Sequence, residues 1–154
     1  MKNLTKSLIY LLFLCLHTVL SAQVLVSEGF EGATFPPTGW LIQNAGSGNN
    51  WIQSTTVSSA GSNSARYAYN MTNAANAWIF TPSLSLNAGD AVSISFKEQV
   101  SSVNFPERLK VTVGNAQTAA SHTTTLLDMP SLVNDVFASK TVTYNAPSTG
   151  VVYP

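Results

Sequence analysis

The chain has 154 residues, with seven lysine and arginine residues against seven aspartate and glutamate residues. Charged residues make up only 9% of the chain and form no basic stripe, so nucleic acid is excluded as an expected partner. Cys15 is the only cysteine, so the chain cannot form an intramolecular disulfide. A sizeable core or a bound cation must stabilise the fold instead.

Residues 1–22 have the layout of a secretory signal peptide. Lys2 and Lys6 precede an apolar run over residues 8–20, and the small residues Ser21 and Ala22 follow. We expect cleavage after Ala22, because the run is too short to span a bilayer comfortably. An uncleaved membrane anchor is the alternative, while large residues before Cys15 argue against a lipoprotein. The sequence therefore predicts a secreted or cell-surface protein in which residues 23–154 form one domain without a transmembrane segment.

Beyond residue 22, short apolar segments alternate with turn residues, which is typical of an all-β fold. Loops are expected around Pro36-Pro37 and over residues 44–50. The clearest strand covers residues 91–97, whose apolar side chains alternate with polar ones, so one face should be buried and the other wet. The other predicted strands include residues 51–53, 66–69, 78–80, 84–86, 108–113, 123–127 and 137–144.

The C-terminal residues Val151-Val152-Tyr153 begin a further strand that stops at once. A sandwich whose final strand is cut short leaves a hydrogen-bonding edge and a core face uncovered, which natural sheets avoid. We therefore expect the domain to be incomplete at its C-terminus, as a fragment of a longer polypeptide with other domains or as a truncated gene product.

Five motifs occur in a recognisable order. They are Glu28-Gly29-Phe30-Glu31-Gly32, Phe35-Pro36-Pro37-Thr38-Gly39-Trp40, Asn50-Trp51, Trp78-Ile79-Phe80-Thr81-Pro82-Ser83-Leu84 and Pro106-Glu107-Arg108-Leu109-Lys110-Val111. Together they resemble the choice-of-anchor J domain, also called the cleaved adhesin domain, of gingipain-type haemagglutinin/adhesin proteins. The resemblance implies a jelly-roll β-sandwich related to MAM and carbohydrate-binding modules, carried by secreted bacterial proteins. It also implies that the final strand extends past Pro154 and that a structural calcium ion is commonly bound.

Four aromatic residues are candidates for ligand binding. Trp40, Trp51, Tyr67 and Tyr69 could present flat faces on which sugar rings stack. For the tryptophans, Trp78 included, packing in the core is the favoured alternative, because each is expected at the start of a strand beside aliphatic residues.

The calcium site implied by the resemblance would use Glu31, with Asn76 as a poorer second ligand. Calcium prefers six to eight oxygen ligands, which include carboxylates and carbonyls. The segment Ala75-Asn76-Ala77 lacks the acidic residues that the family usually carries there, which weakens the site. The alternative for Glu31 is a surface carboxylate near a turn.

No catalytic residues are expected. His122 is the only histidine after residue 22 and is expected on the solvent face of a strand or turn. Glu98 and Glu107 could form the carboxylate pair of a glycosidase, but both are interpreted as ordinary charges at a solvated rim.

The leading hypothesis is thus a non-catalytic, adhesin-type module that binds host or matrix glycan or protein ligands. The alternative is a structural spacer domain of a larger secreted protein, without a tight ligand. A glycoside-active enzyme is the third candidate.

Overall fold

The computed structural model describes residues 23–154, so the predicted signal peptide lies outside the described residues. The described part consists of strands joined by loops and one short 3-10 helix, η1 (Ala119–Ser121). The strands are β1 (Leu41–Asn44), β2 (Trp51–Ser54), β3 (Ser64–Tyr67), β4 (Ala77–Phe80), β5 (Leu84–Leu86), β6 (Ala91–Glu98), β7 (Glu107–Val113), β8 (Thr124–Leu132), β9 (Ala138–Asn145) and β10 (Gly150–Val152). The prediction of an all-β fold is confirmed. No helix in residues 23–154 is long and apolar enough to cross a membrane.

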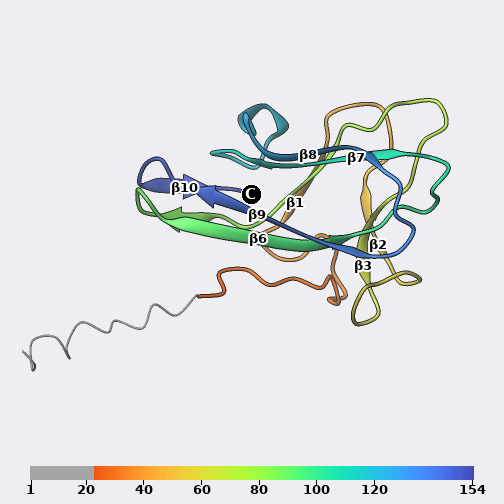
Figure 1. The fold of residues 1–154 in the computed structure, drawn as a ribbon, viewed down its shortest axis with the longest axis horizontal. Helices are drawn as coiled ribbons and strands as arrows, with labels where there is room; N and C mark the ends of the chain where they lie inside the picture. The colour runs from red at the N-terminus through yellow and green to blue at the C-terminus, as the bar shows by residue number, and fades with distance from the viewer. Residues whose placement is uncertain (1–22) are drawn as a thin grey trace, which may run out of the picture.

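The strands form five antiparallel pairs: β1 with β4, β2 with β3, β5 with β10, β6 with β9 and β7 with β8. The β6–β9 and β7–β8 pairs are the longest. Figure 1 shows β7 and β8 as one layer lying over β6 and β9, a sandwich-like arrangement. The jelly-roll connectivity stays a prediction.

Alternation along β6 follows the sequence pattern. Val92, Ile94 and Phe96 are half-buried, while Ser93 and Ser95 are exposed. The partner strand β9 alternates in the same way. Because side chains of a strand point to opposite faces in turn, these two strands present one apolar face to the layer above and one polar face to water.

Aromatic packing and hydrogen bonds hold the segment before β1 against the rest of the domain. Phe30 lies against Trp40, with ring centroids 5.4 Å apart, and against Phe35 at 5.8 Å. The Gln53 side chain of β2 donates hydrogen bonds of 2.7 Å to the carbonyls of Phe30 and Gly32. Ahead of this anchor, the apolar run that begins at Val24 belongs to no strand and is exposed.

The C-terminal strand closes one end of the molecule. β10 pairs with β5 so that Val152 lies opposite Leu84. Leu84, Leu86 and Ala146 form a buried cluster, against which Val92, Tyr144 and Val152 pack. We call β5, β10 and this cluster the closed end. The strand predicted at Val151-Val152-Tyr153 is present as β10, whereas the predicted absence of a final strand stays a prediction.

Candidate ligand pocket

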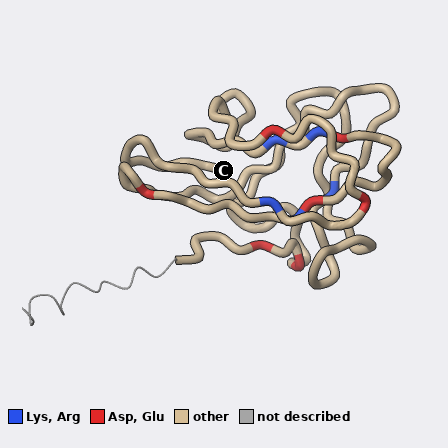
Figure 2. Tube along the Cα trace, viewed as in Figure 1, with Lys and Arg blue, Asp and Glu red and all other residues tan. Residues whose placement is uncertain are grey.

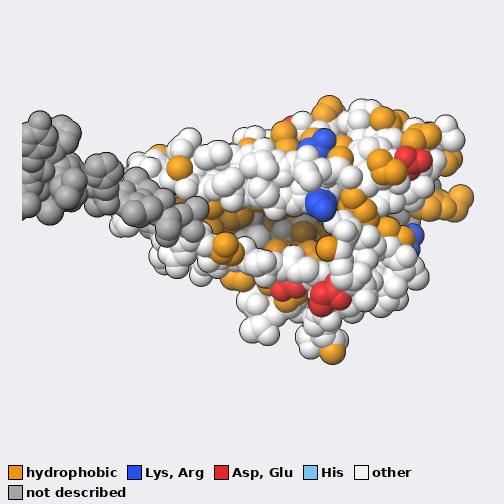
Figure 3. Space-filling view, turned by 60° about the horizontal axis from the view of Figure 1, so that its bottom comes forward, with side chains coloured by type: hydrophobic (Ala, Val, Ile, Leu, Met, Phe, Trp, Pro, Cys, Tyr) orange, Lys and Arg blue, Asp and Glu red, His pale blue; other side chains and the backbone are white. Residues whose placement is uncertain are grey.

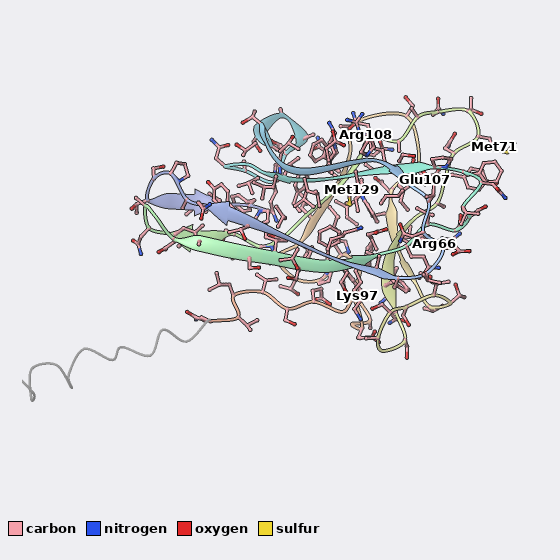
Figure 4. All side chains as sticks on the ribbon, viewed as in Figure 1. Arg66, Met71, Lys97, Glu107, Arg108 and Met129 are labelled. Atoms are coloured by element: carbon pink, nitrogen blue, oxygen red, sulfur yellow. The ribbon has the colours of Figure 1, made fainter. Side chains whose placement is uncertain are left out.

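A pocket of about 230 Å³ lies between the β3–β4 connection and the start of β7. Its lining residues are Tyr67, Tyr69, Asn70, Asn73, Ala74, Ala75 and Glu107. We call it the tyrosine pocket. Figure 4 labels Glu107 and Met71, which mark the end of the molecule where the pocket lies.

Asparagine side chains shape the loop that forms the pocket. The Asn70 side-chain oxygen accepts hydrogen bonds from the backbone N–H groups of Thr72 (2.9 Å) and Asn73 (2.8 Å). The Asn49 side chain donates to the carbonyls of Ala68 and Tyr69, both at 3.0 Å. Asparagine favours such turns because its short side chain bonds to nearby backbone groups. The pocket wall is therefore held in place before any ligand arrives.

The β1–β2 loop comes so close to the pocket that only glycine fits at position 48. A Cβ atom on Gly48 would lie 2.7 Å from the Tyr67 hydroxyl and 3.0 Å from the Ala74 carbonyl. This close approach lets the Asn49 backbone N–H donate to the Tyr67 hydroxyl at 3.2 Å. The Tyr67 hydroxyl thus has its own hydrogen free to donate to a ligand.

The pocket combines flat aromatic surface with polar groups. Tyr69 is 69% exposed at the rim, whereas Tyr67 is half-buried and packs edge-on against Trp51 with ring centroids 6.1 Å apart. Glu107 adds an exposed carboxylate and Asn73 an amide. An apolar ring beside several hydrogen-bonding groups suits a ligand that has both a flat apolar face and hydroxyl groups.

The four aromatic candidates from the sequence have different positions. Tyr67 and Tyr69 line the tyrosine pocket together. Trp51 supports Tyr67, and its indole N–H donates to the Ala77 carbonyl at 3.2 Å. Trp40 packs with Phe30 and does not line the pocket. The sequence favoured core packing for the tryptophans, but it did not show that the two tyrosines share a pocket.

The two predicted calcium ligands have different partners. Both Glu31 carboxylate oxygens accept hydrogen bonds from the Ser62 N–H, and one also accepts from the Asn63 N–H, so the carboxylate fastens this loop. Asn76 instead binds the Trp78 indole N–H at 2.7 Å and the Ala45 carbonyl at 3.3 Å. In the described part of the chain, no three acidic, histidine or cysteine residues gather as a metal site. The calcium site implied by the resemblance therefore stays a prediction.

The expectation that His122 faces solvent is wrong. Its side chain is 8% exposed and lies against Phe80, with ring centroids 4.7 Å apart, and against Trp78 at 5.8 Å. Nδ1 is 3.0 Å from the Thr112 hydroxyl, while the buried Nε2 has no hydrogen-bond partner. Burial lowers the pKa of His122 below its usual value, because the charged ring would be poorly solvated there.

The interpretation of Glu98 as a rim charge is also wrong. Glu98 is 6% exposed, and its side chain accepts a 3.0 Å hydrogen bond from Asn134. The Lys140 ammonium lies 3.5 Å from its other oxygen. Buried charges are costly unless paired, and these neighbours supply the pairing. Glu107, in contrast, is exposed as expected.

The remaining charges are dispersed. Figure 2 shows acidic and basic positions spread over both layers. Arg108 of β7 donates to Asp128 of β8, and this hydrogen bond lowers the pKa of the Asp128 carboxyl. Lys110 also lies beside Asp128. Basic residues of β7 are therefore neutralised within their own layer.

Comparisons of the chain with protein-family models, with curated proteins and with solved structures give no match. The resemblance to choice-of-anchor J domains therefore stays a prediction from the sequence motifs.

Proposed function

We propose that this protein is a non-catalytic, exported binding module that recognises a glycan through the tyrosine pocket. The observation that supports this most is the meeting of Tyr67, Tyr69, Asn73 and Glu107 around one pocket of about 230 Å³. Small-molecule sites typically have volumes of about 300–1,000 Å³. A slightly smaller pocket suits one sugar ring with the rest of the glycan outside.

Each group has a role in this proposal. The exposed Tyr69 ring stacks on the apolar face of the sugar. The Tyr67 hydroxyl and the Asn73 amide donate hydrogen bonds, and the Glu107 carboxylate accepts them from sugar hydroxyls. Asn49 and Asn70 already hold the loop in one conformation, so binding should cost little conformational entropy.

A panel of monosaccharides and short glycans, titrated by isothermal calorimetry, tests the proposal. Tyr69→Ala should weaken binding about tenfold, equivalent to about 1.4 kcal/mol. Met71→Ala is the matched control, because Met71 is 91% exposed on the same loop but does not line the pocket. Equal affinity of the parent and Tyr69→Ala would place the site elsewhere.

The alternatives give distinct results in the same assay. A spacer domain would bind none of the glycans. A glycoside-active enzyme would release product, and Glu107→Gln would stop that release while leaving the fold intact. Glu98 is engaged by Asn134 and Lys140, so it is a poor partner for Glu107 in such chemistry.

A further inference from the structure

The tyrosine pocket carries one negative charge and no positive one. Among residues 23–154, Glu107 is the only charged residue that lines the pocket. Its side chain is exposed at the start of β7 and takes part in none of the ion pairs within these residues. The carboxylate is therefore available to interact with a charge on the ligand.

The basic residues next to the pocket in the sequence do not neutralise this charge. Arg108 follows Glu107 directly, but its guanidinium is paired with Asp128 of β8. Arg66 precedes Tyr67 on β3 and is exposed. Because successive strand residues point to opposite faces, Arg66 and Tyr67 face different sides of that strand. Figure 4 labels both arginines, and neither lines the pocket.

The wider surface supplies little positive charge either. Charged residues make up 9% of the chain. On the face that Figure 3 shows, basic side chains lie singly among hydrophobic and uncharged ones. Exposed charges more than about 10 Å apart are largely screened at 0.1 M salt. The electrostatic potential inside the pocket is therefore set mainly by its own carboxylate.

The uncharged groups of the pocket also suit a cation. Aromatic rings attract cations to their faces, and Tyr67 and Tyr69 both line the pocket. The Asn70 side-chain oxygen is already used by the backbone of its own loop. The Asn73 side chain makes no hydrogen bond within residues 23–154, so its amide oxygen can accept one from the ligand.

We propose that the sugar selected by the tyrosine pocket is an amino sugar with a free, protonated amine. This inference rests on the proposed glycan-binding function and names the class of sugar. The ammonium group donates a charge-assisted hydrogen bond to the Glu107 carboxylate and lies beside the tyrosine rings. The apolar face of the sugar stays on Tyr69. Sugars that carry a carboxylate are disfavoured, because Glu107 repels them and no cation in the pocket compensates.

A lysine side chain carries the same ammonium group, but it matches the pocket less well. The exposed Tyr69 ring offers flat apolar surface beside the carboxylate, which a sugar ring covers with one face. Lysine has a flexible four-carbon chain, so it loses more conformational entropy on binding than a rigid ring does. A glycan with free amino groups is therefore the better ligand.

The test compares sugars that differ at a single position. Glucose, galactose and mannose are each titrated against their 2-amino and 2-acetamido derivatives and the corresponding uronic acid, with binding measured by shifts of the protein's amide NMR signals. In the ring configuration that the pocket accepts, the amino sugar should bind about tenfold more tightly than the hexose. The acetamido sugar should lose this preference, because it has no charge. The uronic acid should bind more weakly than the hexose.

Two protein variants assign the preference to one carboxylate. In Glu107→Gln, the affinity ratio of amino sugar to hexose should fall from about ten to about one. Asp135→Asn is the matched control, because Asp135 is exposed, takes part in no ion pair within residues 23–154 and does not line the pocket. Its ratio should stay at about ten. In the parent, the ratio should decrease as the salt concentration rises, because Glu107 is exposed.

The outcomes separate this inference from the proposed function. Equal affinities of amino sugar and hexose in the parent, or a ratio that persists in Glu107→Gln, would overturn the inference and leave glycan binding intact. Nα-acetyl-lysine amide that binds as tightly as the best amino sugar would also overturn it, because the sugar ring would then contribute nothing. Binding of no sugar at all would overturn the proposed function, and the inference with it.

Discussion

The closed end and strand β7 differ in burial although their sequences alternate in a similar way. Leu84 and Leu86 of β5 are 8% and 6% exposed, whereas Leu109 and Val111 of β7 are only half-buried. Both strands alternate apolar and polar residues. The difference is that β5 pairs with β10 along one edge. The edge of β7 that faces away from β8 is paired only just beyond the strand, at Gly114. Burial in this molecule therefore depends on how strand edges are paired, more than on local hydrophobicity.

The largest expected effect comes from truncating one leucine at each place. Leu86→Ala should destabilise the protein by about 2–5 kcal/mol, because it leaves a cavity in a buried cluster. Leu109→Ala, its matched control in β7, should cost about half as much, since much of that side chain already contacts water. Urea unfolding of both variants measures the difference. Equal costs of Leu86→Ala and Leu109→Ala would contradict this difference, because they would show that Leu109 is as well packed as the closed end.

A smaller effect concerns His122, which packs against Trp78 and Phe80 of β4. Its pKa is lowered in the folded protein, mainly by burial, so the unfolded chain binds its proton more tightly. The stability that follows from the neutral ring is present above the unfolded pKa of about 6.5 and is lost as pH falls below it. The melting temperature of the parent should therefore fall between pH 7 and pH 5.

His122→Phe keeps an aromatic ring against Phe80 and removes the titrating group. Its melting temperature should depend less on pH over the same range. An unchanged pH dependence in this variant would contradict the assignment of the effect to His122.

The sequence predicts the strands better than their contacts. Alternation in β6 and β7 is visible because strand side chains repeat every two residues. His122 and Glu98 could not be placed this way. The burial of His122 depends on Trp78 and Phe80, and that of Glu98 on Asn134, all of which are distant in the sequence. Propensity and pattern are local, whereas these environments are made by tertiary contacts.

The tyrosine pocket was predictable only in part. Tyr67 and Tyr69 were identified by residue type, but Asn49, Asn70 and Asn73 were not. The asparagine-rich stretch from Asn70 to Asn76 was a signal of turns, and its polar groups prove to shape the pocket wall. Glu107 joins them only because β7 begins beside the β3–β4 connection, a register that no sequence pattern contains.

The smallest expected effect concerns Glu31, which fastens the loop near β3 by accepting backbone hydrogen bonds from Ser62 and Asn63. Glu31→Gln keeps one acceptor oxygen but loses the charge, so it should lower stability by about 1 kcal/mol without affecting either the closed end or β7. Glu28→Gln is the control, because Glu28 accepts only from the nearby Phe30 N–H.

The melting temperature, measured once with calcium and once with a chelator, then distinguishes two roles for the Glu31 carboxylate. A calcium-dependent rise in the parent that disappears in Glu31→Gln would make the carboxylate a metal ligand, as the family resemblance implies. The same destabilisation with and without calcium would make Glu31 a loop anchor alone, as its two backbone partners favour.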